Sequence, residues 1–68
     1  MRLRQLREEQ KFSQADLGEL LGMNQNTISR YETGVREPSI RDLVLIADYF
    51  RVSVDYLLCR TDNPVMNK

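Results

Sequence analysis

A run of amide, hydroxyl and guanidinium side chains at positions 25–30 offers hydrogen-bonding chemistry without a catalytic group. Gln25 and Asn26 carry carboxamides, Ser29 a hydroxyl and Arg30 a guanidinium. Carboxamides can bond adenine through N6 and N7, a guanidinium can bond guanine through O6 and N7, and a hydroxyl suits either base. A solvated helix more often shows Glu and Lys, which are better helix formers than Asn or Ser. These residue types favour contact with base edges over a plain solvated surface, which is the alternative.

Helical geometry decides where these side chains point. At about 100° per residue, Ile28 and Tyr31 share one face, which must meet a core, and the polar set lies largely opposite. Only Gly22-Met23-Asn24 joins this helix to the one before it, and so short a connection forces a sharp bend. Gly18 lies on the inner side of the preceding helix, where a small residue permits close approach. The pattern predicts two helices that cross at a tight turn.

Cap residues predict an all-α fold of five short helices. Ser13 with Asp16 resembles a capping box at the start of the second helix, and Gly22 is suited to end it. The first helix is expected over about residues 1–10, and the third over about 25–32, between the cap Asn24 and Gly34. Ser39, with Asp42 three residues later, is expected to cap the fourth helix, and Ser53 the fifth. The buried side of the fourth helix is expected to comprise Leu43, Val44, Ile46, Ala47 and Phe50.

The stretch SQADLGELLGMNQNTISRYETG over residues 13–34 resembles the helix-turn-helix of the phage lambda-repressor and Cro family, also called the xenobiotic-response-element type. The segments REPS at 36–39 and VSVDYLL at 52–58 continue the resemblance, which covers about residues 1–60. It implies a five-helix, lambda-repressor-like DNA-binding domain over 1–60, followed by a short C-terminal tail over 61–68 that looks frayed. It also implies a bacterial or phage transcriptional regulator, most simply a repressor, that binds double-stranded DNA.

The resemblance assigns roles residue by residue. Gln25, Asn26 and Arg30, with Ser29 near them, are expected to face bases in the major groove. Gln14, Thr27, Thr33 and Arg36 are expected to contact the sugar-phosphate backbone, and Gln14 is also expected to brace the recognition helix. Gln14 could instead be merely a helix-start residue, and Arg36 a free loop charge. Arg7 and Glu32 are expected to form a partly buried ion pair. Cys59 departs from the family, since many relatives have glycine where the last helix ends.

Composition excludes several other classes of function. The chain of 68 residues has no histidine and one cysteine, so a zinc site of the usual kind and a catalytic dyad both lack their groups. We therefore expect no enzyme activity, no metal and no cofactor, and no small-molecule ligand is evident. No apolar run approaches the ~20 residues of a membrane span, and a single cysteine fits a cytoplasmic protein. The net charge of zero argues mildly against nucleic acid.

Assembly is the remaining expectation. One recognition helix covers few base pairs, so a homodimer on a palindromic operator is expected. Apolar residues crowd the end of the chain, and Val54, Leu58 and Cys59 are expected near the two-fold axis. A different class of function stays open at this point, because a helix-turn-helix bundle can also serve as a protein-interaction module. Selection from random DNA sites separates the two, since only the regulator enriches a palindrome.

Overall fold

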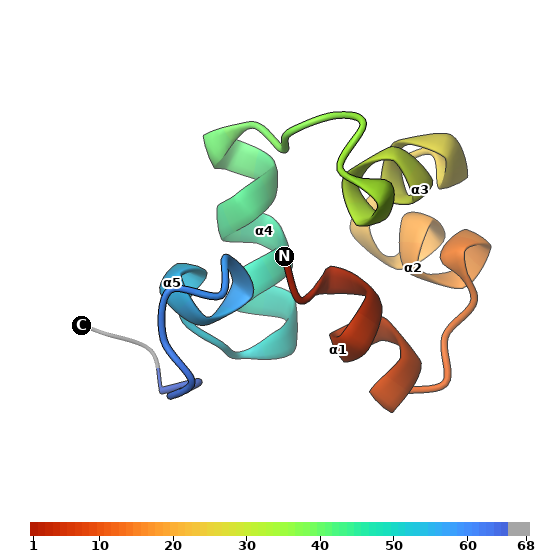
Figure 1. Cartoon of the computed structure of the whole chain (residues 1–68). Coiled ribbons are helices and arrows are strands. Elements are labelled where there is room, and N and C mark those ends of the chain that lie inside the picture. Colours follow the sequence, from red (N-terminus) through yellow and green to blue (C-terminus); the bar gives the residue numbers. More distant parts are fainter. Residues whose placement is uncertain (66–68) are drawn as a thin grey trace.

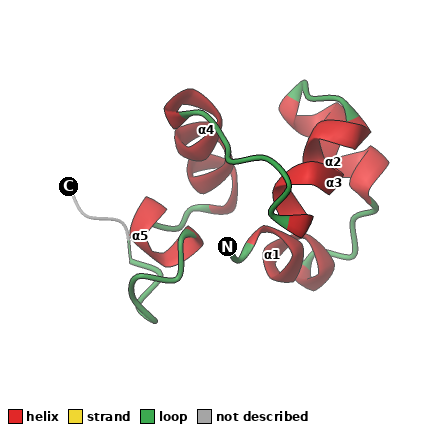
Figure 2. Cartoon of the chain, turned by 45° about the horizontal axis from the view of Figure 1, so that its top comes forward, coloured by secondary structure: helices red, strands yellow, loops and turns green. Residues whose placement is uncertain are grey.

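The computed structural model describes residues 1–65, which contain five helices and no strand (Figure 1). In chain order these helices are α1 (Leu3–Glu9), α2 (Gln14–Leu21), α3 (Gln25–Thr33), α4 (Ile40–Phe50) and α5 (Val54–Leu57). Figure 2 shows α2 and α3 together at one side and α5 at the other. The predicted all-α architecture with five helices is therefore confirmed.

The helix ends follow the predicted caps. The Ser13 hydroxyl accepts from the backbone N–H of Asp16 while the Asp16 carboxylate accepts from that of Ser13, which completes a capping box. Gly22 and Gly34 both adopt the left-handed conformation just past α2 and α3, with φ of 68° and 79°. The first helix is shorter than expected because the chain turns at Lys11, whose φ of 60° is incompatible with a helix.

Each helix contributes one large, fully buried aliphatic side chain to a single core. These side chains are Leu3, Leu17, Ile28, Ile46 and Leu57. The prediction for α4 was wrong at Val44, which is 45% exposed. The buried stripe of α4 is centred on Ile46 and Ala47, and at about 100° per residue Val44 falls outside it. With so few residues in the core, each one has a large share in stability.

Gly18 permits a close approach, although its neighbour is the turn after α2 rather than the body of α3. A Cβ at Gly18 would lie 2.6 Å from the carbonyl oxygen of Met23, which is closer than atoms can pack. The Met23 N–H in turn donates to the Gly18 carbonyl at 2.7 Å. The missing side chain thus lets the turn fold down onto α2, and this fixes where α3 begins.

The segment after α5 is attached to the domain and is not frayed over the described residues. The Arg2 guanidinium donates to the carbonyl of Thr61 at 3.2 Å and to the carboxylate of Asp62 at 2.9 Å. The backbone N–H of Ser53 donates to the carbonyl of Pro64 at 3.0 Å. The last three residues of the predicted tail, 66–68, lie outside the described residues.

Residues 1–65 contain neither a membrane-spanning helix nor a metal-binding cluster of acidic, Cys or His side chains. No helix there is long and apolar enough to cross a membrane. No cluster of three or more His, Cys, Asp or Glu side chains there is placed to hold a metal ion.

Cys59, where many relatives have glycine, lies in a backbone conformation that strains a residue with a side chain. Cys59 follows α5 with a φ of 63°, the left-handed conformation in which glycine is unstrained. We expect Cys59→Gly to stabilise the fold by about 1 kcal/mol and to raise Tm by several degrees, since the strain removed exceeds the extra entropy of an unfolded glycine. Thermal denaturation measures the change. Cys59→Ala is the control, and an equal rise for alanine would assign the effect to the thiol instead.

Candidate nucleic-acid interface

The third helix, α3, presents one apolar side to the core and a polar side to solvent. Ile28 and Tyr31 are buried, while Gln25, Asn26 and Arg30 are exposed. Ser29 is only partly exposed, less than the sequence pattern suggested, because it lies about 100° from Ile28 around the helix. The structure therefore brings the two carboxamides and the guanidinium onto one open surface, with the hydroxyl at its edge.

The start of α3 is held by the residues just before it. The Asn24 side chain accepts from the backbone N–H of Asn26 at 2.8 Å and so caps the helix. Gly22 and the turn against Gly18 fix the direction in which the chain leaves α2. The packing of α2 against α3 is the most extensive of any helix pair in the described chain. The position of Asn26 is thus set by contacts within about ten residues of sequence, from Gly18 onward.

The end of α3 is held by a buried ion pair with α1. Arg7 donates to the Glu32 carboxylate through Nε at 2.7 Å and through Nη2 at 3.1 Å, in the paired geometry that suits a guanidinium and a carboxylate. The side chains are only 12% and 3% exposed. The hydrogen bond to Glu32 is the main cause that raises the pKa of the Arg7 guanidinium, and burial opposes it. Arg7 also donates to the carbonyl of Phe12 at 2.7 Å, which ties in the loop before α2.

Gln14 joins this pair at the start of α2. Its side-chain N–H donates to Oε1 of Glu32 at 3.1 Å, and Gln14 is itself partly buried. Glu32 therefore accepts three hydrogen bonds, from two side chains on two other helices. The resemblance implies that Gln14 bonds a phosphate and braces the recognition helix. Its hydrogen bond to Glu32 agrees with the second role, and the phosphate contact stays a prediction.

Of the other residues expected at the DNA backbone, Thr27 and Arg36 line a hollow, whereas the Thr33 hydroxyl bonds within its own helix. Arg36 is exposed in the loop after α3, Thr27 on α3 is partly buried, and both line the same hollow. The Thr33 hydroxyl lies within bonding distance of the carbonyls of Ser29 and Arg30, at 3.0 and 3.3 Å, so its proton is already directed into the helix. Thr27 and Arg36 are thus on one surface, while the Thr33 hydroxyl is engaged inside its own helix.

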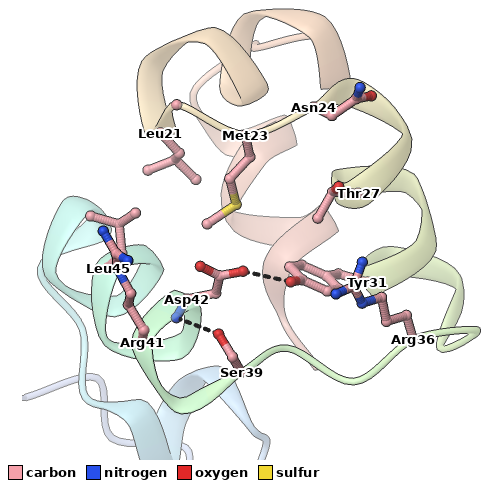
Figure 3. Close-up of a pocket in the computed structure, with 11 residues that line it drawn as sticks. Leu21, Met23, Asn24, Thr27, Tyr31, Arg36, Ser39, Arg41, Asp42 and Leu45 are labelled. Atoms are coloured by element: carbon pink, nitrogen blue, oxygen red, sulfur yellow. Dashed lines mark hydrogen bonds between the residues drawn. The ribbon is translucent and has the colours of Figure 1, made fainter.

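A hollow of about 520 Å³ separates α3 from the start of α4 (Figure 3). Thr27, Tyr31 and Arg36 line it from the α3 side, and Arg41 and Asp42 line it from α4. The Tyr31 hydroxyl donates to the Asp42 carboxylate at 2.5 Å across this hollow. That hydrogen bond is the main cause that raises the pKa of the Tyr31 hydroxyl, and burial adds to the shift.

Arg41 was missed by the sequence analysis. It lies in the first turn of α4 and lines the same hollow as Arg36. A cation in the first turn of a helix is unfavourable, because the helix dipole places partial positive charge there. An arginine at a position where the helix dipole disfavours a cation suggests a role outside the helix, and the sequence could have pointed to Arg41 in this way.

The chain resembles known proteins over most of its length. A family model described as "Helix-turn-helix" matches residues 3–57. The chain is 40% identical over 63 residues to the "Uncharacterized HTH-type transcriptional regulator YobD" of Bacillus subtilis (strain 168), which is 93% of this chain and 56% of that protein. It is 39% identical over 59 residues to the "HTH-type transcriptional regulator AnsR" of the same organism, covering 87% of this chain and 51% of AnsR.

The name of a third relative states how that protein acts on transcription. The "HTH-type transcriptional activator BcrR" of Enterococcus faecalis is 35% identical over 57 residues, which is 84% of this chain and 28% of BcrR. The chain spans about half the length of YobD and AnsR. No solved structure matches the chain significantly.

The buried pair yields a prediction about stability. Removing either partner leaves an uncompensated buried charge, so we expect Arg7→Ala and Glu32→Ala each to lower the free energy of unfolding by ~3–5 kcal/mol. Urea denaturation of the two single variants and the double variant measures the coupling. Arg4→Ala is the matched control on α1, because the Arg4–Glu8 pair is exposed and surface pairs contribute under about 1 kcal/mol. Additive losses in the double variant would contradict the pairing.

Proposed function

The chain belongs to the helix-turn-helix family of transcriptional regulators, and from this premise we propose that it is a sequence-specific repressor that reads a palindromic DNA operator. The observation that carries the proposal is the exposed row Gln25, Asn26 and Arg30 on a helix anchored by Ile28 and Tyr31. Such a helix fits the major groove, where base edges present distinct patterns of donors and acceptors.

Each exposed side chain of α3 has a suitable partner on DNA. Arg30 can donate two hydrogen bonds to guanine, and Gln25 and Asn26 can each bond adenine through N6 and N7. None of the three side chains makes a hydrogen bond to another residue within 1–65, so their donors and acceptors remain available. Ser29 at the edge of the row is the fourth proposed base contact.

Backbone contacts then set the register of α3 on the duplex. Arg36 and Arg41 supply positive charge beside the hollow, and Thr27 supplies a hydroxyl. Gln14 and Thr33 complete the proposed set. The Gln14 amide has a second N–H besides the one it gives to Glu32, whereas the Thr33 hydroxyl must first release its internal acceptor before it can donate to a phosphate. Arg36 and Arg41 are therefore the main phosphate contacts of the proposal.

Repression needs no contact beyond DNA, because a protein that occupies a promoter blocks polymerase directly. One relative, BcrR, carries the name of an activator, and an activator must also touch the transcription machinery. A promoter reporter with the operator placed over or upstream of the start site distinguishes the two. Lower expression in the first placement supports repression, and higher expression in the second contradicts it.

Alanine variants on α3 test base recognition. We expect Asn26→Ala and Arg30→Ala each to weaken binding to a selected operator by ~1–3 kcal/mol and to relax sequence preference, while unfolding stays nearly unchanged. Arg36→Ala is expected to weaken operator and random DNA alike. Arg60→Ala, an exposed arginine beyond α5, is the control. Gel-shift titrations on both duplexes measure these affinities, and equal operator affinity for all variants would refute base recognition.

The proposed dimer face needs one revision. Val54 packs against the core, so it is a poor candidate for the two-fold axis, while Leu58 and Cys59 are exposed. On α4, Ile40 is 81% exposed and Val44 45% exposed, one helical turn apart. Leu43 lies between them in sequence and lines a hollow of about 390 Å³ with Leu58. We therefore propose that the contact involves Leu58 and Cys59 together with the exposed apolar residues Ile40 and Val44 of α4.

A palindrome requires the two α3 helices to lie about 34–36 Å apart, so two copies joined there must reach this spacing on DNA. Because the exposed apolar area is small, we expect weak dimers in solution and strong cooperativity on a palindromic duplex. Leu58→Asp should abolish that cooperativity, and Leu20→Asp, a similarly exposed leucine on α2, should not. Analytical ultracentrifugation with and without DNA measures both. Binding of one monomer per palindrome by the wild type would contradict the dimer.

A further inference from the structure

Helices α2 and α4 both begin with a serine cap followed three residues later by an aspartate, but the two aspartate carboxylates have different partners. Ser13 and Asp16 at α2 exchange both hydrogen bonds of a capping box. At α4 the Ser39 hydroxyl accepts from the Asp42 backbone N–H at 3.1 Å, but the Asp42 carboxylate accepts from the Tyr31 hydroxyl on α3. A local bond has been exchanged for a contact between two helices. Such an exchange indicates that the orientation of the Asp42 carboxylate toward Tyr31 has a role of its own.

The surroundings of Asp42 explain what is gained. Figure 3 shows Arg36 and Arg41 on either side of the Tyr31–Asp42 hydrogen bond. Because Arg36, Arg41 and Asp42 line the same hollow, a carboxylate released there could turn toward either guanidinium group, and an ion pair would neutralise that group. A carboxylate turned toward a DNA backbone would also repel phosphate. The Tyr31 hydroxyl holds the Asp42 side chain inside the hollow, and neither arginine forms an ion pair with a described residue.

We propose that Tyr31 is a positioning residue for DNA binding, whose hydroxyl sequesters the Asp42 carboxylate and so leaves Arg36 and Arg41 available to phosphate. The inference rests on the proposed function and adds a component to it. The buried ring of Tyr31 anchors α3 in the core, while its hydroxyl controls the charge of the adjacent surface. One side chain thus couples the base-contacting helix to the backbone-contacting loop.

Removal of the hydroxyl separates these two tasks. In Tyr31→Phe the ring still packs, but Asp42 is free to pair with Arg36 or Arg41. We expect affinity for operator and random DNA to fall about five- to tenfold together, with a salt slope shallower by about one unit. Asp42→Asn keeps an acceptor for the hydroxyl and removes the charge. The double variant Tyr31→Phe/Asp42→Asn has no carboxylate to release, so it should recover most of the lost affinity.

The experiment uses a duplex enriched by the wild-type protein from a random library and a scrambled duplex of equal length, titrated at several salt concentrations. Tyr49→Phe is the matched control, since Tyr49 lies on α4 outside the hollow and its ring contacts Phe12 and Phe50. Thermal denaturation accompanies each variant, because a merely structural role would lower Tm without rescue by Asp42→Asn.

The outcomes are distinct. Loss in Tyr31→Phe and recovery in the double variant support the proposal. An unchanged Tyr31→Phe, or a double variant as weak as the single one, overturns it while leaving the wild-type operator binding intact. If the wild type enriches no duplex at all, the proposed function fails and this inference fails with it.

Discussion

Glu32 is a carboxylate buried at the end of a helix that has only two buried apolar side chains of its own, Ile28 and Tyr31. A charge in that position is costly unless several donors compensate it, because removal from water raises its free energy by several kcal/mol. Arg7 from α1 and Gln14 from α2 supply those donors, and Arg7 reaches on to the carbonyl of Phe12. The arrangement of α1, α2 and the loop between them around α3 therefore depends on satisfying this one carboxylate. The same network ties the end of α3 to α1 and α2, and such support is what the placement of the proposed base-contacting side chains requires.

The composition of α3 determines which of its side chains hold it in the fold and which remain open to solvent. Its apolar side is too narrow to hold it by hydrophobic burial alone, so polar contacts hold it at three places: the Asn24 cap at the start, Tyr31 toward α4, and Glu32 at the end. All three leave the opposite surface open. The contacts that hold α3 and the surface proposed to read DNA consequently lie on different faces, so residues on the open face can be substituted at little cost to folding.

Local rules explain which features the sequence predicted. Caps such as Ser13 and Asn24 depend on hydrogen bonds over two or three residues, and the burial of Ile28 and Tyr31 depends on helical periodicity, so both follow from neighbouring residues alone. The Arg7–Glu32 pair came from family resemblance, since no local rule joins residues so far apart in sequence. The Tyr31–Asp42 bond was not predicted, because the carboxylate of Asp42 had an equally good local use in a capping box and only the tertiary arrangement decides between them. Val44 was misplaced for a related reason, since an apolar residue at the edge of a stripe can face inward or outward with little difference in local pattern.

The net charge of zero, which argued mildly against nucleic acid, describes the whole chain rather than its proposed binding face. Field strength at a surface depends on which charges remain uncompensated there. Between residues 25 and 42 the acids are Glu32, Glu37 and Asp42, and of these Glu32 is buried against Arg7 while Asp42 is tied to Tyr31. The bases in the same stretch, Arg30, Arg36 and Arg41, are all exposed. With Glu32 paired to Arg7, the three exposed arginines of this stretch are set against two carboxylates, those of Glu37 and Asp42, so the stretch keeps a net charge of +1 although the whole chain is neutral.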